Sequence, residues 1–527
     1  MEGKKMGIIR KLIMGLFAAI MAVILYLLLF VADGLDFYLK RSFLMPQWQM
    51  MLGGLFVCLI VCMLCAACFR RQKERSVCTI QHKSLIAECL FWGALFMLQA
   101  VMSYYAYFLT DWDVGVILTD AYNMATYQNP LYLNLSYYSE HTNNVLIVEI
   151  FAAIIRIFRS FAGDPGMDRC VLILIFVQCA LNTGTGVLLR QTARRLTGSA
   201  AFSVTVAALY TVFLGFTPWL MIPYSDGMTI FVPVLTLLLY QRMRESDHKI
   251  LYAIAIGVAA VYGYLIKPQS VLLTIALVIY ETVRLVFSRR FVCFAKSIGC
   301  MLAVIALGIG PWNQAMMSRS MLNVDASRDI GMMHYFMLGM NADTRGTFSS
   351  DDLIKSLYMP QEDRTRMQFQ EAIARIEDME WSGFMELMRD KTLINFADGT
   401  FAWGINGIFF AQLIEDKDAV ISPLLKSIIY TDGKHYPVFS TFLQCVWLAL
   451  LLGSALALAA YAALREQKQK DALLIIMLSL IGLTVFEWIF EAKARYLFVM
   501  APIYVLTGAM GIWYAAGRIW KMLRKER

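Results

Sequence analysis

The sequence predicts an all-α protein that crosses a membrane many times, on three observations. Of its 527 residues, 59% are apolar and only 16% are charged, and the mean hydropathy is +0.59. Several apolar runs reach the ~20 residues that a helix needs to span a lipid bilayer. The lysines and arginines behind the net charge of +8 lie in short clusters between these runs, which indicates a lipid bilayer and not a nucleic acid as the partner.

Taken in order, the apolar runs predict about 12 transmembrane helices. The first run follows Lys4 and Lys5, and it is too long for a cleaved signal peptide, so we interpret it as a retained signal anchor. The expected spans are residues 8–32, 50–69, 86–109, 170–190, 199–216, 226–241, 250–266, 270–287, 297–314, 438–463, 472–490 and 497–517.

Basic residues set the expected orientation, because cytoplasmic loops are enriched in Lys and Arg. Lys4 and Lys5 place the N-terminus in the cytoplasm, and the basic loop 70–75 sends the stretch after Asp111 to the outer face. Both termini are then cytoplasmic. The segment 144–161 is short and carries three charged residues, so we expect an amphipathic juxtamembrane helix at the outer interface instead of a span.

This orientation predicts three parts in the chain. Residues 1–314 form an N-terminal transmembrane bundle with an outer catalytic loop at 110–169. Residues 315–437 form an extracytoplasmic helical segment, which we expect to pack on the bundle as a small cap. Residues 438–527 form the C-terminal transmembrane helices and a basic cytoplasmic tail.

An acidic pair opens the outer loop directly after a predicted span. A carboxylate of Asp111 or Asp113 in that position can act as a general base toward a hydroxyl group. Helical spacing would place Asp120 on the same face as Asp113. In the structural alternative, Asp111 caps the following helix and Asp113 stabilises its N-terminal dipole.

Several cations are also expected at the outer face, against the positive-inside bias. They are Lys267, next to Pro268 at a span end, and Lys493 and Arg495, which follow Glu487 and Glu491. A lipid phosphate would suit them, because Arg offers fork-shaped donors and Lys a point charge. Alternatively, Lys267 is a snorkelling residue and the two glutamates simply pair with the cations.

Further candidates for substrate binding each have a structural alternative. Asp226 either contacts substrate or caps a helix, and His334 is either functional or structural. Trp403 could stack on a sugar or pack the cap, and the sequence does not choose between them. The candidate substrate-binding residues are Asp120, Asn143, Asn144, Asp226, His334, Trp403 and Glu491.

Together these stretches resemble the GT-C superfamily of integral-membrane glycosyltransferases, especially bacterial members related to protein mannosyltransferases and aminoarabinose transferases. The similar stretches are spread over nearly the whole chain: Trp112-Asp113, Tyr137 through Asn144-Val145, Ile266-Lys267-Pro268, His334 with Gly339-Met340-Asn341, and Glu491 through Tyr496. The chain departs from the family pattern at Glu140-His141-Thr142, where relatives usually carry an aromatic residue and a proline.

The resemblance implies a bacterial plasma-membrane enzyme with its active site on the outer face. It would move a single sugar from a polyprenyl-phosphate-linked donor to an extracytoplasmic acceptor, which is a cell-envelope polymer, a lipid or a protein. Asp113 would be the base with Asp111 as its alternate, and Lys267, Lys493 and Arg495 would hold the donor phosphate. Some relatives need a divalent cation such as Mg or Mn and others do not, so a metal is undecided. The alternative function is a flippase or transporter of a lipid-linked saccharide.

Overall fold

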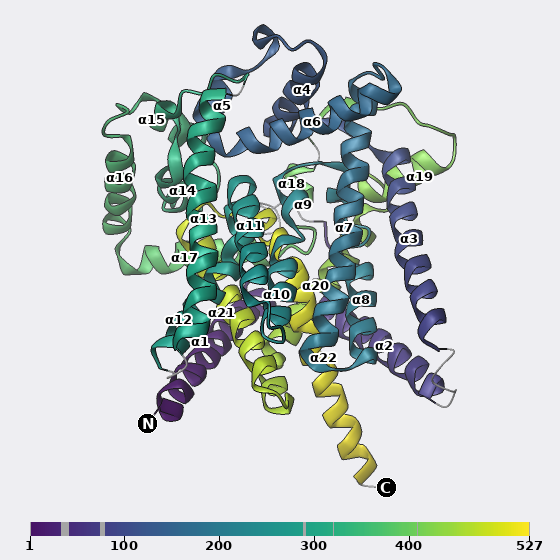
Figure 1. The fold of residues 1–527 in the computed structure, drawn as a ribbon. Coiled ribbons are helices and arrows are strands. Elements are labelled where there is room, and N and C mark those ends of the chain that lie inside the picture. Colours follow the sequence, from purple (N-terminus) through teal and green to yellow (C-terminus); the bar gives the residue numbers. More distant parts are fainter. Residues whose placement is uncertain are drawn as a thin grey trace.

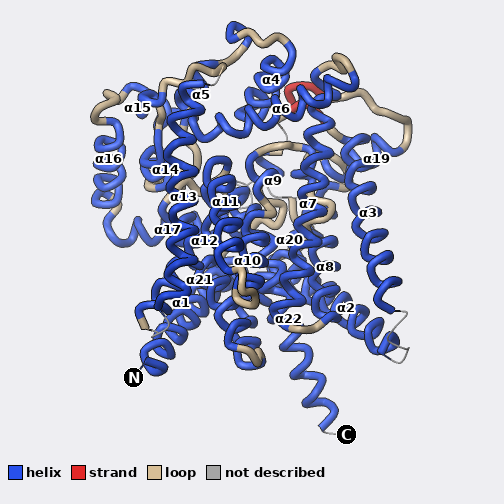
Figure 2. Tube along the Cα trace, viewed as in Figure 1, coloured by secondary structure: helices blue, strands red, loops and turns tan. Residues whose placement is uncertain are grey.

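The computed structural model describes residues 2–32, 42–73, 80–287, 291–319, 321–407 and 409–525. Most of these residues are helical, and the two short strands (red in Figure 2) are joined to the helices by loops and turns (tan). The predicted all-α, polytopic fold class is confirmed. The part of the basic loop 70–75 after Lys73 and the last two residues of the chain lie outside the described residues.

Within the described residues, ten helical segments are long and apolar enough to cross a membrane. Two of them include a short 3-10 turn before the α-helix, namely η5 (Pro268–Val271) before α12 and η7 (Ala494–Met500) before α22. The helices are α1 (Glu2–Phe30), α2 (Gln47–Lys73), α3 (Ile80–Ala106), α7 (Met167–Thr197), α11 (Lys249–Ile266), α12 (Leu272–Val286), α13 (Phe291–Arg319), α20 (Tyr436–Ala463), α21 (Gln467–Ile489) and α22 (Ala501–Lys525).

The two remaining expected spans are shorter helices. α8 (Ala200–Phe213) ends after 14 residues. The expected span 226–241 is divided into α9 (Ser225–Thr229) and α10 (Val232–Met243). Neither α8 nor α10 reaches the ~20 residues that a bilayer requires. Both are mostly buried against longer helices, so packing and not lipid sets their length.

The other helices and the two strands lie in the connections between the spanning helices. The two strands, β1 (Phe108–Thr110) and β2 (Phe410–Leu413), pair antiparallel. They join the chain just before α4 to the chain between α18 and α19. The remaining α-helices are α4 (Trp112–Thr126), α5 (Leu135–Glu140), α6 (Val145–Ala162), α14 (Gly331–Gly339), α15 (Ser350–Tyr358), α16 (Arg364–Asp378), α17 (Glu380–Phe396), α18 (Trp403–Asn406) and α19 (Ile421–Ile429).

The last helix, α22, forms the centre of the bundle. The apolar stretch of this helix that could cross the membrane is almost wholly buried, and the helix packs most extensively on α20. The two backbones approach very closely, because a Cβ on Gly508 would lie 2.5 Å from the carbonyl oxygen of Leu450. Small residues at a helix crossing allow such close packing in membrane proteins.

The two ends of the molecule differ in character. Both ends of the described chain lie at one end of the bundle, whereas α4, α5 and α6 cover the opposite end (Figure 1). α6 is amphipathic: it buries Val148, Phe151 and Ile155 and exposes Ile157 and Phe161. It packs on α4 and is not among the spanning helices.

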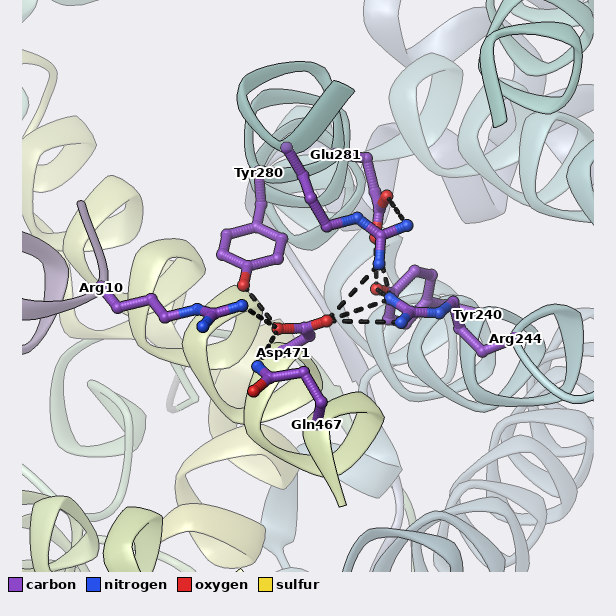
Figure 3. Close-up of polar contacts among 8 residues, drawn as sticks. Arg10, Tyr240, Arg244, Tyr280, Glu281, Gln467 and Asp471 are labelled. Atoms are coloured by element: carbon purple, nitrogen blue, oxygen red, sulfur yellow. Dashed lines mark hydrogen bonds and ion pairs between the residues drawn. The ribbon is translucent and has the colours of Figure 1, made fainter. Parts of the chain in front are cut away.

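A buried ionic network ties the helices together at the end that holds the termini (Figure 3). Asp471 of α21 lies at its centre and is 3.4 Å from Arg10 of α1 and 3.3 Å from Arg244. Tyr280 of α12 donates a hydrogen bond to the same carboxylate at 2.7 Å. We call this group of side chains the proximal network. The other members are Tyr240, Glu281, Arg284 and Gln467.

Part of the expected cap is inserted into the bundle. α14 and α16 pack on each other with a small apolar core of their own, but every residue from 390 to 404 is buried. The irregular backbone there finds side-chain donors: Trp447 donates to the carbonyl of Phe396 at 2.8 Å and Trp219 to that of Thr400 at 3.0 Å. Non-helical backbone at membrane depth requires such partners, so we call residues 390–404 the inserted segment.

Candidate functional site

Six of the charged residues singled out in the sequence meet at the ends of several helices. α21 begins in the proximal network and α11 starts a few residues after Arg244, so both run away from the termini toward their last residues. There η7 contacts both η5 and α9. We call the charged group at this place the distal cluster. Its members are Asp113, Asp226, Lys267, Glu491, Lys493 and Arg495.

Asp226 joins two of the cations directly. The Nζ atom of Lys267 lies 2.8 Å from Asp226 Oδ1, and Nε of Arg495 lies 3.5 Å from Oδ2. All three side chains are buried. A carboxylate between two buried cations offsets part of their desolvation cost, so Asp226 holds Lys267 and Arg495 at a fixed separation.

Aromatic rings surround the guanidinium group of Arg495. Its Cζ atom lies 4.4 Å from the centre of the Trp112 ring and 5.4 Å from that of Tyr224. Tyr496 and Trp219 follow at 5.8 and 5.9 Å. Within the described residues, no acceptor takes a hydrogen bond from its Nε or Nη1 atom. The cation is therefore held in place with unused donors, which is costly unless an anion meets them.

The backbone at Trp112 is strained to allow this arrangement. Trp112 has a φ of 55°, in the left-handed region, which costs a non-glycine residue about 1–2 kcal/mol. The Asp111 side chain accepts a hydrogen bond from the Trp112 amide at 2.9 Å and caps α4. Backbone strain of this kind gathers at functional sites, and here it directs the indole ring onto Arg495.

Asp111 and Asp113 lie in different surroundings. Asp111 is exposed and serves as the helix cap, whereas Asp113 is half-buried in the first turn of α4. Burial raises the pKa of the Tyr137 phenol, and the nearby Asp113 carboxylate raises it further. Tyr137 therefore stays protonated at neutral pH and offers its hydroxyl to Asp113. Asp113 also lies within electrostatic range of Lys493.

The strip from Glu491 to Tyr496 completes the distal cluster. The Tyr496 hydroxyl donates to Glu491 at 2.6 Å, and the Lys267 ammonium lies 4.4 Å from the centre of the Tyr496 ring. Burial lowers the pKa of Lys493 to about 8, and the adjacent Arg495 cation contributes to this shift. Lys493 is therefore still largely protonated at pH 7.

Two further charged residues lie beside the cluster. Lys391 of α17 is fully buried, and its ammonium donates to the carbonyls of Gly339 and Phe490 at 2.8 and 2.7 Å. Burial lowers its pKa to about 7. Glu487 of α21 is also fully buried, close to Lys391 and Lys267, and neither carboxylate oxygen has a hydrogen-bond partner within the described residues.

Lys391 was not among the candidates chosen from the sequence. A signal was present, because Leu387 and Ile394 lie one turn away on either side and are both buried. A lysine on an otherwise apolar helix face is unusual. The sequence predicts that this helix belongs to a small cap packed on the bundle, where such a lysine would be unremarkable.

Three of the other candidates brace the polar loop after α4. The Asp120 carboxylate is buried and accepts hydrogen bonds from the backbone and side-chain amides of Asn134. Asn144 is buried and donates to the Tyr137 hydroxyl at 2.7 Å, whereas Asn143 is exposed and donates to Asn144 at 3.2 Å. Of these three residues, Asn144 is linked to Asp113 indirectly, because Tyr137 contacts both side chains.

The last two candidates are buried away from the cations. His334 of α14 lies 2.8 Å from the Ser356 hydroxyl, and burial lowers the pKa of its imidazole to about 4. Trp403 lies in the main core, where its indole donates to the Ile429 carbonyl at 2.8 Å. The Trp403 ring is 1% exposed and packs in the main core of the bundle, not in the small core between α14 and α16.

Among the described residues, no group of three or more His, Cys, Asp or Glu side chains is placed to hold a metal ion.

The apolar helices and the buried ionic cluster define the class of the molecule, a polytopic integral membrane protein with a charged site among its helices. Residues 6–516 match a family model with the description "Conserved hypothetical integral membrane protein", and the chain belongs to this family. A sequence comparison with curated proteins gave no match.

Comparison with solved structures found archaeal oligosaccharyltransferases. The apo enzyme of Archaeoglobus fulgidus aligns with 82% of this chain and 52% of its own, at 11% identity and a TM-score of 0.40. Oligosaccharyltransferase AglB of the same organism, solved with an inhibitory peptide and a dolichol-phosphate, aligns with 83% of this chain at 13% identity and a TM-score of 0.40. The chain spans about half the length of these proteins.

Proposed function

We propose that the protein is a GT-C type membrane glycosyltransferase that moves one sugar from a polyprenyl-phosphate-linked donor to an acceptor on the outer face of the membrane. One observation carries the proposal. Arg495 is buried in a ring of aromatic side chains with unused donors, and the half-buried carboxylate Asp113 shares its surroundings. A phosphate-binding cation and a basic carboxylate are the two groups that such a transfer needs.

The donor phosphate would bind Arg495, Lys267 and Lys493. Arginine gives a fork of donors to a phosphate, and a charge-assisted hydrogen bond is stronger than a neutral one. Before the donor binds, Asp226 neutralises part of this charge. The phosphate would then take the unused Nη1 donor of Arg495 and leave both ion pairs of Asp226 in place.

Asp113 would act as the base. Its carboxylate takes the proton of the acceptor hydroxyl as the oxygen forms a bond to the anomeric carbon of the sugar. The bond between that carbon and the phosphate oxygen breaks, and the electron pair leaves with the lipid phosphate. Arg495 would stabilise the negative charge on the departing phosphate, in a buried setting where electrostatic interactions are strong.

The orientation and the remaining residues belong to the proposal as well. The positive-inside bias puts the termini in the cytoplasm of a bacterial plasma membrane and the distal cluster on the outer face. Asp120, Asn143, Asn144, His334 and Glu491 would shape the acceptor side of the site, either directly or by holding the loop after α4. A divalent cation would be tested by assaying with Mg²⁺, with Mn²⁺ and with a chelator.

The test begins with cells that lack the protein. The polyprenyl-linked sugar that accumulates in them identifies the donor, and the purified protein in nanodiscs is then supplied with that donor carrying a radiolabelled sugar. Asp113→Asn should lower transfer about 10²- to 10⁴-fold, the usual contribution of a general base. Asp111→Asn is the matched control, because an asparagine can still cap α4, and it should have a milder effect. Equal activity of Asp113→Asn and wild type would refute the assignment of the base.

A second candidate, a flippase or transporter of a lipid-linked saccharide, is favoured by one observation. α9 and α10 form a broken helix next to the distal cluster, and η5 interrupts the chain between α11 and α12. Discontinuous helices near a charged site are typical of transporters. Movement of a fluorescent donor across a vesicle membrane without formation of a new glycosidic bond would support this function in place of transfer.

A further inference from the structure

A second charged site lies at the end of the bundle that holds the termini, away from the distal cluster. A groove of about 430 Å³ opens between the last turns of α7 and α10 and the first turn of α21. The residues around it are Gln191, Arg194, Arg195, Gly198, Arg242, Glu245, Glu466, Lys468 and Gln469. Nearly all of these side chains are polar or charged, so the groove does not suit an apolar ligand.

The charges in the groove do not balance. Four cations face two carboxylates, which leaves an excess of two positive charges. Glu245 forms ion pairs with Arg195 and with Lys468, the latter at 2.9 Å, and Glu466 pairs with the same lysine at 2.9 Å. These pairs engage both carboxylates with only two of the cations.

The other two cations can still form ion pairs or hydrogen bonds with a ligand. Arg194 is exposed and has no ion-pair partner among the described residues. Arg242 donates to Gln191 at 3.2 Å, but its buried Nε atom meets no acceptor in the described part of the chain. A buried guanidinium donor without an acceptor is costly unless a ligand supplies one. The groove therefore fits an anion that carries two negative charges.

The position of the groove indicates the source of the anion. α7 and α21 are spanning helices, and the groove lies where the first ends and the second begins. α11 starts at the same end and exposes Leu251, Ile254 and Val258 along one face, as a lipid-facing helix does. Ends of spanning helices lie at the depth of the lipid headgroups, where basic pockets bind anionic lipids.

The first turn of α21 favours an anion further. Glu466 caps this helix and its side chain already accepts a backbone N–H, but the helix dipole still adds partial positive charge at that end. A second, much smaller pocket shares Arg195 and Lys468 with the groove and is also lined by Tyr240 and Arg244 of the proximal network. The groove and the proximal network are therefore neighbours at this end of the bundle.

We propose that this groove binds the phosphate headgroup of a dianionic membrane lipid. The proposal is independent of the glycosyltransferase function, because it concerns a different site with different residues. In a membrane the lipid would hold the ends of α7, α10 and α21 together by neutralising Arg194 and Arg242.

The test uses the full-length protein in detergent and tetraoleoyl cardiolipin as the probe. Cardiolipin should raise the melting temperature of the wild type, and dioleoyl phosphatidylethanolamine should not. The double variant Arg194→Gln/Arg242→Gln should bind cardiolipin about thirtyfold more weakly, since each basic residue near an anionic lipid contributes about fivefold. The matched control Lys5→Gln/Arg518→Gln removes two exposed cations at the same end but outside the groove, and its binding should stay near that of the wild type.

Three results would overturn the proposal. Equal weakening in the control pair would show general attraction to a basic surface, and unchanged binding in the double variant would show that the groove is not the site. Equal protection by inorganic pyrophosphate would assign the groove to a soluble phosphate compound. If the double variant fails to fold, Arg194→Gln alone serves, because that side chain is exposed and unpaired; unchanged cardiolipin binding in this single variant would then refute the proposal.

Discussion

Lys391 offers the sharpest test of how the distal half of the molecule is held together. Its ammonium connects α17 to the last residue of α14, Gly339, and to Phe490 at the end of α21. The backbones are close at this point, because a Cβ on Gly339 would lie 2.4 Å from the carbonyl oxygen of Ile489. The substitution Lys391→Met keeps the length of the side chain and removes both hydrogen bonds.

The expected loss follows from those two bonds. At pH 7.5 the amine is mostly neutral, so each hydrogen bond contributes about 0.5–1.5 kcal/mol, and each carbonyl left buried without a donor costs about 1–3 kcal/mol. Relief from burying an amine offsets part of this loss, so we expect Lys391→Met to lower the free energy of unfolding by about 2–4 kcal/mol at pH 7.5. Lys355→Met is the matched control, because Lys355 is 47% exposed and only pairs with Glu371. An exposed pair contributes less than about 1 kcal/mol.

The pH dependence separates a buried amine from a merely well-packed side chain. Burial lowers the pKa of Lys391 from its ordinary value of 10.5 to about 7 in the folded protein, so between these values the unfolded chain binds the proton more tightly. The free energy of unfolding then rises with pH, by at most about 1.4 kcal/mol per unit. Wild type should therefore gain up to about 2 kcal/mol over Lys391→Met between pH 7.5 and 9.

Thermal unfolding in one detergent, followed by tryptophan fluorescence at several pH values, measures both effects. If wild type and Lys391→Met show the same pH dependence, the amine is not buried as described. If Lys355→Met is as destabilised as Lys391→Met, the two carbonyl contacts do not explain the loss.

Further expectations concern both ends of the molecule. Arg495→Gln should raise the donor KM about tenfold or more with little change in melting, and an unchanged donor saturation curve would contradict the phosphate assignment. Asp471→Ala should destabilise the fold by about 3–5 kcal/mol, because it removes the buried carboxylate that Arg10, Arg244 and Arg284 share; equal melting would argue against the proximal network. Gly508→Val should prevent α20 and α22 from packing and abolish a monodisperse elution peak. In a cysteine-free background, Asn134→Cys and Ser350→Cys should both react with an impermeant maleimide in intact cells, and labelling of only one would refute the shared outer face.

The spanning helices could be predicted because their signal is local. An apolar run of sufficient length specifies a span without reference to the rest of the chain, and ten such helical segments appear within the described residues. α8 and α10 could not be recognised as short, since their sequences are as apolar as those of true spans. Their ends depend on what packs against them.

The site was partly predictable for a similar reason. Counting spans places Lys267, Arg495 and Asp226 on one side of the membrane, and the structure brings them into contact. Asp111 caps α4 and is exposed, whereas Asp113 is half-buried, and this difference depends on the left-handed backbone of Trp112 between them. Nothing in the sequence indicates that conformation for Trp112. Tertiary packing decides it.

The inserted segment has a consequence for the order in which the chain is made. Residues 390–404 leave the ribosome before α20 and α22, which supply Trp447 and the packing surface of Tyr504. Until those helices arrive, part of the segment's backbone lacks its partners, and the earlier spans cannot enclose it alone. The arrival of α20 and α22 thus determines when the core around the inserted segment can form.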